Sequence, residues 1–200
     1  MSKKLNFYDY SLPKLQDFLL NEGFKKYSAT QMFEWVYLKD ELDFNNMSNL
    51  ALVTREFMIN NFTFALPTVH ELQESEDGTV KLLLKLGDGS LVETVLMRYR
   101  YGNSVCVSTQ VGCNMGCRFC ASGLLKKKRD LTPGEMLGQV LMINEYLKGR
   151  GEFKLTTHVV LMGTGEPFDN FENILDFIDL LNNPKSLAIG ARHITVSTVG

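Results

Sequence analysis

The spacing of apolar residues over the first 65 positions predicts helices. From Leu12 to Leu19, large apolar residues recur at three- and four-residue intervals and would lie on one helix face. A capping box at Ser28-Ala29-Thr30-Gln31 predicts the start of a second helix. A third helix is expected from about residue 48 to residue 60. This part of the chain is therefore predicted to be a small helical unit with aromatic residues and methionines in its core.

Residues 66–110 change to a pattern typical of strands. Val80–Leu86 and Leu91–Met97 are predicted strands, and Gly87-Asp88-Gly89 between them predicts a hairpin turn. The glycine and aspartate residues of that turn favour the backbone conformations that a tight reversal needs. A β-hairpin is therefore expected to link the helices to the rest of the chain.

The second half of the chain alternates short apolar runs with helical stripes. Strands are expected at Val105–Ser108, Val159–Met162 and His193–Thr198. A capping box with proline at the first helical position, Thr132-Pro133-Gly134-Glu135, predicts the start of the first intervening helix, and Asp169 is expected to cap the second. The order strand-helix-strand-helix-strand predicts a parallel α/β sheet.

Chain length limits the domain organisation. Two hundred residues allow one large domain or two small ones. We expect an α/β protein in which residues 1–97 form an accessory domain of helices and a β-hairpin and residues 98–200 form part of a (β/α) barrel. A full eight-unit barrel takes about 250 residues. The chain ends directly after its third predicted parallel strand, so we expect the barrel to be truncated there.

Composition and charge exclude several classes of protein. The chain is 44% hydrophobic and 22% charged, an ordinary globular balance. Its net charge of -2 means that any nucleic-acid contact comes from a local patch, for which Lys126-Lys127-Lys128-Arg129 is the candidate; a solvated basic loop is the alternative. No apolar run approaches the roughly 18 residues of a membrane span, and no signal core follows Met1. A cytoplasmic protein with reduced cysteines is expected.

All four cysteines lie within residues 106–120. The spacing Cys113-x3-Cys117-x2-Cys120 supplies three thiolates from one loop that follows a strand. A structural zinc site takes four ligands, so zinc would need Cys106 or His158 as the fourth. An iron–sulfur cluster held by three cysteines instead leaves one iron open to another molecule. The spacing favours the cluster, and zinc remains the alternative.

A second candidate element is the loop Gly163-Thr164-Gly165-Glu166-Pro167, which follows a predicted buried strand. Its glycines would allow a ligand to approach the backbone closely, and Glu166 could accept a hydrogen bond from an ammonium group. An ordinary turn between strand and helix is at least as common for such a loop. The ligand-binding interpretation gains support from the cysteine-bearing loop, because α/β barrels place their active sites at the same edge.

Three segments together resemble the radical S-adenosylmethionine superfamily, whose mark is CxxxCxxC, and within it the RlmN family of dual-specificity RNA methyltransferases. They are residues 106–120, Gly165-Glu166-Pro167 and residues 191–200. The resemblance covers nearly all of the chain. It implies a radical S-adenosylmethionine barrel and methylation of C2 of an adenine in 23S rRNA and in tRNA. It also implies an electron donor such as flavodoxin, no membrane association and a monomeric full-length protein.

The resemblance further implies residue roles. Three cysteines would hold a [4Fe–4S] cluster whose open iron binds S-adenosylmethionine: Cys113, Cys117 and Cys120. Four residues match positions that bind S-adenosylmethionine: Gly165, Glu166, Pro167 and Ser197. Glu93 matches the general base of the reaction, and Cys106 matches the cysteine that forms a disulfide during turnover.

Departures from the family pattern limit the prediction. No cysteine follows Cys120, so the cysteine that carries the methyl group in the family is absent, and the chain as written is not expected to methylate RNA by that mechanism. A related family methylates C8 of the same rRNA adenine. Its pattern has cysteine in place of Val111 and alanine in place of Pro167, which favours C2 here. Two hypotheses from different classes of protein are a zinc-stabilised RNA-binding module without catalysis and an electron carrier.

Overall fold

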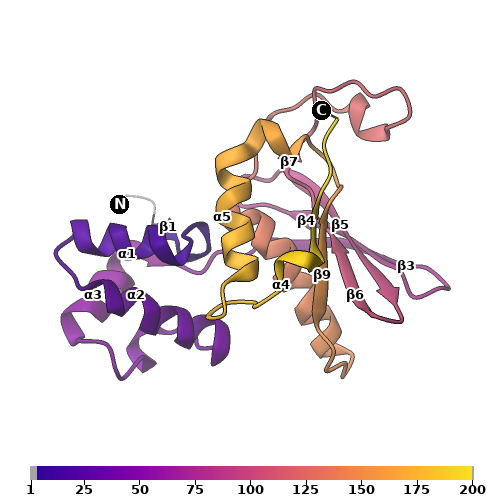
Figure 1. The fold of residues 1–200 in the computed structure, drawn as a ribbon. Coiled ribbons are helices and arrows are strands. Elements are labelled where there is room, and N and C mark those ends of the chain that lie inside the picture. The colour runs from indigo at the N-terminus through magenta and orange to yellow at the C-terminus, as the bar shows by residue number, and fades with distance from the viewer. Residues whose placement is uncertain (1–3, 200) are drawn as a thin grey trace.

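The computed structural model describes residues 4–199, which form a helical unit and a mixed β-sheet covered on one face by helices (Figure 1). The helical unit contains α1 (Leu12–Asn21), α2 (Lys26–Phe33) and α3 (Leu52–Asn61). It is closed by two short parallel strands, β1 (Leu5–Asn6) and β2 (Phe62–Thr63). No helix within residues 4–199 is long and apolar enough to cross a bilayer.

Two of the predicted helix starts in this unit are wrong. Helix α2 begins at Lys26, and Ser28 lies buried inside it with its N–H bonded to the Lys25 carbonyl at 3.0 Å. Packing of this turn against α1 outweighs the preference of serine for a cap. Helix α3 begins at Leu52, because the Leu50 N–H bonds to the Met47 carbonyl (3.0 Å) and closes a separate turn first.

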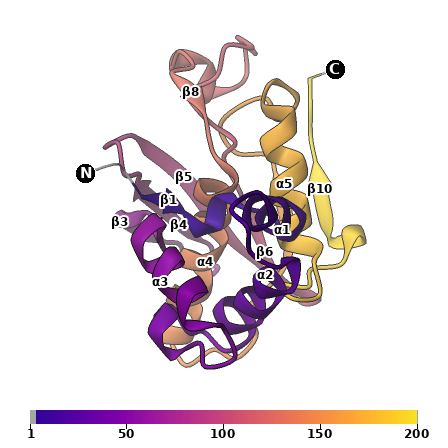
Figure 2. The same ribbon diagram turned by 90° about the vertical axis from the view of Figure 1, so that its left-hand side faces the viewer.

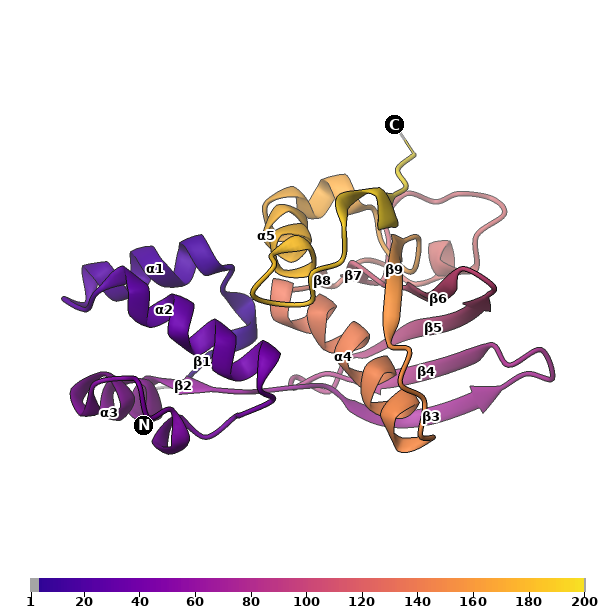
Figure 3. The same ribbon diagram turned by 60° about the horizontal axis from the view of Figure 1, so that its bottom comes forward.

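The main sheet has six strands in the spatial order β10-β9-β6-β5-β4-β3 (Figure 3). Their bounds are β3 (Thr68–Glu74), β4 (Val80–Lys85), β5 (Leu91–Tyr99), β6 (Gly102–Cys106), β9 (Thr156–Leu161) and β10 (Ile194–Val196). Strands β6, β9 and β10 are parallel, whereas β3, β4 and β5 are antiparallel and join the sheet through the β5–β6 pair. The α/β class is confirmed, and the predicted hairpin is part of the same sheet as the parallel strands. The division expected after residue 97 falls inside β5.

Helices α4 (Pro133–Gly149) and α5 (Phe171–Asn182) cover one face of this sheet. The capping box of α4 is confirmed: Thr132 Oγ1 accepts the Glu135 N–H (3.2 Å), and Glu135 Oε2 accepts the Thr132 N–H (3.1 Å). The cap expected at Asp169 is wrong. A 3-10 turn at Pro167–Asn170 precedes α5, and Glu166 caps that turn instead.

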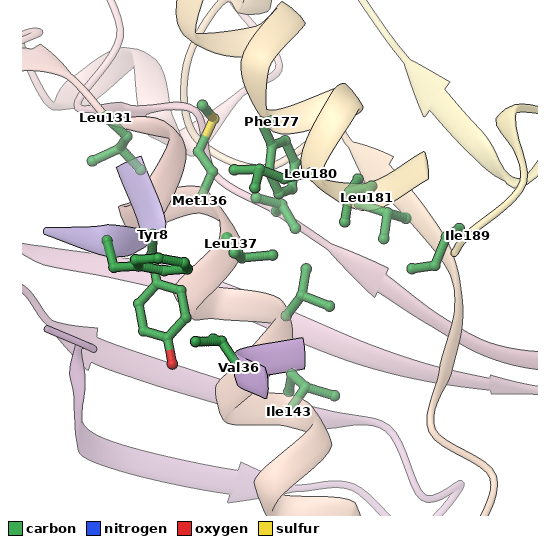
Figure 4. Packing of buried hydrophobic residues seen from close by; sticks show 14 of the residues in the cluster. Tyr8, Val36, Leu131, Met136, Leu137, Ile143, Phe177, Leu180, Leu181 and Ile189 are labelled. Atoms are coloured by element: carbon green, nitrogen blue, oxygen red, sulfur yellow. The ribbon is translucent and has the colours of Figure 1, made fainter. Parts of the chain in front are cut away.

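The helical unit docks directly on α4, in front of it in Figure 2. The Gly134 N–H donates to Asp9 Oδ1 at 3.0 Å. A Cβ at Gly134 would lie 2.7 Å from that oxygen, and one at Gly138 would lie 2.6 Å from Pro67 Cδ, so both contacts require glycine. Figure 4 shows Tyr8 of the helical unit beside Leu137 of α4. The two parts therefore share one hydrophobic core.

Candidate cluster and cofactor site

The three clustered cysteines lie on a loop whose ends are fixed. Residues 112–128, the cysteine loop, connect β7 (Gln110–Val111) to β8 (Arg129–Asp130), and these two strands pair antiparallel. The Lys128 N–H bonds to the Val111 carbonyl (2.7 Å), and the Cys113 N–H bonds to the Leu125 carbonyl (2.8 Å). Figure 1 shows the loop beyond the sheet, at the end where the C-terminal segment also lies. The loop therefore projects from the edge where the parallel strands end.

A close approach at the base of the loop requires glycine. Gly112 has a φ of +76°, and a Cβ there would lie 2.2 Å from the Lys126 carbonyl oxygen. Any side chain would push the two sides of the loop apart, because backbone atoms cannot yield as a flexible side chain can. Gly112 therefore allows the two sides of the cysteine loop to meet at its base.

Thiol groups are suitable ligands for a soft metal, but the three cysteine side chains do not converge on one position. Cys113 and Cys117 are half-buried, Cys120 is exposed, and all are free thiols. Hydrogen bonds from the Ser122 backbone and side chain lower the pKa of the Cys120 thiol, which favours the thiolate that binds metals. Within residues 4–199, no three His, Cys, Asp or Glu side chains converge closely enough to hold one metal ion. The donor set thus fits an iron–sulfur cluster, and the loop must close to hold one.

Among the described residues, no fourth zinc ligand lies beside the cysteine loop. Cys106 ends strand β6, and His158 lies in β9 with its ring stacked on that of His193 at a centroid distance of 4.3 Å. Among the described residues neither forms a metal-binding group with the loop cysteines. Four-ligand zinc binding would therefore need a larger rearrangement than closure of the loop alone.

The loop Gly163–Pro167 packs on the residues that lead into the cysteine loop. The Thr164 carbonyl accepts the N–H groups of Thr109 (2.8 Å) and Gln110 (3.1 Å). Gly165 has a φ of +120°, and a Cβ there would lie 2.5 Å from Thr109 Oγ1. The conformation of Gly165 is therefore required by contact with the chain itself. The Thr164 and Ser122 hydroxyls, 3.2 Å apart, also join the two loops directly.

Glu166 is buried and ionised, with both carboxylate oxygens engaged by its own chain. Oε1 accepts the Phe168 N–H (3.0 Å) and Oε2 accepts the Val199 N–H (3.1 Å). Burial alone would raise the pKa of Glu166, but these bonds and one from Thr198 offset it, and the pKa is lowered. A carboxylate has about four lone-pair sites, so these three bonds leave one site for a further donor. Glu166 thus links its loop to the segment after β10 and can still accept an ammonium group.

The other two predicted cofactor contacts differ in exposure. Pro167 is buried at the first position of the 3-10 turn that Glu166 caps. Ser197 is exposed just beyond β10, with its N–H 3.4 Å from the Leu161 carbonyl of β9. The structure therefore brings Gly165, Glu166, Pro167 and Ser197 to one edge of the sheet, and their contacts with a cofactor remain a prediction.

Glu93 and Cys106 lie on the same face of the sheet, opposite α4 and α5. Cys106 pairs with Val95, and Glu93 precedes Val95 by two positions on β5, which makes Glu93 and Cys106 diagonal neighbours. Such neighbours lie about 7–8 Å apart. Glu93 Oε1 forms an ion pair with Lys81 Nζ at 3.2 Å. Burial raises the pKa of the Cys106 thiol, so this cysteine is held as a thiol.

Ser108 connects two candidate site segments, a role that the sequence patterns did not predict. Its hydroxyl donates to the Glu93 carbonyl (2.7 Å) and accepts the Thr164 N–H (3.1 Å). Ser108 therefore connects the strand of the predicted base to the predicted cofactor loop. No local sequence pattern indicates this role, because Glu93 and Thr164 lie 15 and 56 positions from Ser108.

Two of the four basic residues at positions 126–129 are already paired with carboxylates of the same chain. Lys127 Nζ pairs with Asp130 (2.9 Å) and with Asp169 (3.8 Å). Arg129 pairs with Asp88 and Glu135. Lys126 and Lys128 are exposed and form no ion pair within the described part of the chain. A phosphate-binding surface would therefore consist of these two lysines.

The fold of this chain is similar to that of a radical SAM methyltransferase whose structure has been solved. The match is the crystal structure of such an enzyme from Sphaerobacter thermophilus, with a TM-score of 0.83, 37% identity, and coverage of 98% of this chain and 57% of that one. Residues 5–63 match the family model of the ribosomal RNA large subunit methyltransferase N-terminal domain, RlmN_N.

Curated relatives give the more particular likeness. A probable dual-specificity RNA methyltransferase RlmN of Listeria welshimeri is 52% identical over 198 residues, which cover 99% of this chain and 54% of the relative. The corresponding Shouchella clausii protein is 49% identical over 200 residues, covering 100% of this chain and 56% of the relative. The chain spans about half the length of the curated relatives it matches. The resemblance to the RlmN family predicted from the motifs is confirmed.

Proposed function

We propose that this chain supplies the cluster- and cofactor-binding part of a radical S-adenosylmethionine RNA methyltransferase of the RlmN type. The observation that carries the proposal is the pair of hydrogen bonds from Thr109 and Gln110 to the Thr164 carbonyl. They join the predicted cofactor loop to the segment entering the cysteine loop, where the parallel strands end. That edge is where α/β barrels place their chemistry.

Three thiolates on one exposed loop are the cluster ligands in this proposal: Cys113, Cys117 and Cys120. Once reduced by a donor such as flavodoxin, a bound [4Fe–4S] cluster would supply the electron for reductive cleavage of S-adenosylmethionine. The ionised Glu166 carboxylate would accept the cofactor's ammonium group, with Gly165 and Pro167 shaping the loop around it. The exposed Ser197 hydroxyl would contact the cofactor from the end of β10.

The open face of the sheet would act on the RNA base. C2 of adenine is electron-poor, so transfer of a methyl cation to it is unfavourable and a radical route is required. The half-exposed Glu93 carboxylate, which forms an ion pair with Lys81, would take the proton that leaves C2. In the full-length protein, the Cys106 sulfur would form the disulfide by attacking the sulfur of the methyl-carrying cysteine, which this sequence does not contain, as the bond from that sulfur to the transferred carbon breaks. We propose 23S rRNA and tRNA as substrates of the full-length protein, in the cytoplasm.

The test is metal analysis of protein purified and reconstituted without oxygen. We expect about four irons and four sulfides per chain, and an EPR spectrum of the reduced sample that shifts on addition of S-adenosylmethionine. Cys117→Ala should lose the iron, whereas Cys106→Ala should retain it, because Cys106 lies outside the cysteine loop. Folded protein with one zinc and no iron would overturn the proposal and favour a zinc-stabilised RNA-binding module.

A further inference from the structure

We propose that Arg129 is a positioning residue that sets the orientation of the cysteine loop relative to the sheet. The guanidinium lies at the point where the loop re-enters the fold, as the first residue of β8. The assignment of this loop to a cluster rests on the proposed function, whereas the positioning role rests on the hydrogen bonds of the Arg129 guanidinium.

The Arg129 guanidinium joins three segments of the chain. Its Nε donates to Asp88 Oδ2 in the β4–β5 turn at 2.8 Å. Its two terminal nitrogens donate to both carboxylate oxygens of Glu135 in the first turn of α4, at 2.7 and 2.8 Å. Two parallel hydrogen bonds between a planar guanidinium and a carboxylate fix the relative orientation of the two groups as well as the distance between them. Arg129 therefore ties the end of the cysteine loop to both the sheet and the helix layer.

Both acceptors are held in place independently of Arg129. Asp88 accepts the Ser90 N–H (2.9 Å) and the Ser90 hydroxyl (3.2 Å), which fixes its side chain within the turn. Glu135 Oε2 accepts the Thr132 N–H as part of the capping box. The hydrogen bond from Arg129 also holds the pKa of Asp88 far below its usual range, so this carboxylate stays charged. The guanidinium thus binds to preformed, charged anchors.

The loop has few other ties to the rest of the molecule. The hydrogen bonds at its base lie within the β7–β8 pair, whose strands are two residues long. A pair this short has little stability of its own and relies on neighbouring contacts, such as the hydrogen bonds from Thr109 and Gln110 to the Thr164 carbonyl. Beyond them, the direct links among the described residues are the Ser122–Thr164 hydroxyl contact and the ion pairs of Lys127 with Asp130 (2.9 Å) and Asp169 (3.8 Å). Phe119 at the tip is 95% exposed. Arg129 is the tie that joins the end of this loop to the β4–β5 turn and to α4, so we expect it to set the orientation of the loop.

The chain contains a matched control near the opposite end of the strands, where β5 ends and β9 begins. Arg98 of β5 forms the same two-pronged contact with Glu152, at 2.5 and 2.8 Å, and its Nε donates to the Gly78 carbonyl (2.9 Å). The side chains of Arg98 and Arg129 are similarly exposed, 26% and 32%. Arg98→Gln removes an equivalent ion pair and its hydrogen bonds without touching the cysteine loop.

The experiment compares Arg129→Gln, Arg129→Lys and Arg98→Gln by hydrogen exchange of the metal-free chain and by iron content after reconstitution. Arg129→Gln should speed exchange of amides in residues 112–128 about tenfold, the effect of losing charged hydrogen bonds. Exchange in β4 and β5 should stay unchanged. Arg129→Lys keeps the charge but not the paired geometry and should show a smaller increase. Arg98→Gln should leave exchange in the loop unchanged.

Asp88→Asn provides a milder second variant, because it weakens one Arg129 contact and leaves the capping box of α4 intact. Equal loop exchange and equal iron content in Arg129→Gln, Asp88→Asn and Arg98→Gln would overturn the positioning role. Faster loop exchange with normal loading would confine the role to the metal-free loop and overturn its part in cluster binding. If wild-type protein binds no iron while Arg129→Gln still loosens the loop selectively, the positioning role stands and the proposed function fails.

Discussion

Gln139 of α4 binds the backbone of Ser108 through both ends of its side-chain amide. Gln139 Oε1 accepts the Ser108 N–H, and Gln139 Nε2 donates to the Ser108 carbonyl, each at 2.9 Å. Both residues are completely buried. The helix thus supplies hydrogen bonds where β6 has ended, and it fixes the residue whose hydroxyl connects Glu93 to Thr164.

Replacing Gln139 should destabilise the whole chain. Gln139→Leu keeps a similar volume but leaves a buried N–H and a buried carbonyl of Ser108 without partners. The expected loss is about 2 kcal/mol of unfolding free energy or more, measured by urea denaturation. Gln73→Leu, at an exposed position of β3, should change stability by less than about 0.5 kcal/mol. Equal losses for the two variants would contradict the role given to Gln139.

Gly165 should tolerate no side chain. In Gly165→Ala the new Cβ would meet Thr109 Oγ1 at 2.5 Å and Gln110 Cβ at 2.8 Å, in a backbone conformation with positive φ. We expect a loss of about 1–3 kcal/mol, as for an overpacked site, seen as a lower thermal midpoint. Gly190→Ala is the control, because Gly190 has a φ of -58° and nothing within 4 Å of the new Cβ. A normal midpoint for Gly165→Ala would show that the two loops separate readily.

The ionised state of Glu166 should make stability depend on acid pH. Its pKa is lower in the folded chain than the ordinary value of 4.5, so its contribution is fully present above pH 4.5 and is lost as pH falls through the folded value. Glu166→Gln should therefore be less stable than wild type at neutral pH, and the difference should narrow below pH 4.5. Urea midpoints of both proteins across this range give the measurement. A difference that does not change with pH would contradict the argument.

Exposed lysines of the basic run should carry any salt-sensitive RNA affinity. Lys126→Gln with Lys128→Gln should weaken binding of a single-stranded RNA and reduce the slope of log affinity against log salt by about 1.4, at about 0.7 per phosphate contact. Lys127→Gln is the control, because Lys127 is already paired with Asp130 and Asp169. Fluorescence anisotropy in a salt series measures both quantities. An equal change of slope in the control would show that the ion pairs open on binding.

Several local features of the fold could be predicted from the sequence because their causes are local. The hairpin turn at Gly87–Gly89 and the capping box from Thr132 to Glu135 depend on residues within four positions of one another. The same kind of signal misled at Ser28 and Asp169. There, burial against α1 and the carboxylate of Glu166 decided where the helical turns begin.

Three features follow from the order of the residues alone: the periodic strands and helices, the spacing of the three cysteines and the resemblance to the RlmN family. The pairing of β5 with β6, which places Glu93 and Cys106 on one face, becomes visible only in the folded chain. The same holds for the contact of Glu166 with Val199 and for that of Arg129 with Asp88. Periodicity and caps arise between near neighbours, whereas these contacts join residues up to 41 positions apart, as Arg129 and Asp88 are. Strand pairing and burial choose such partners, and no local pattern encodes that choice.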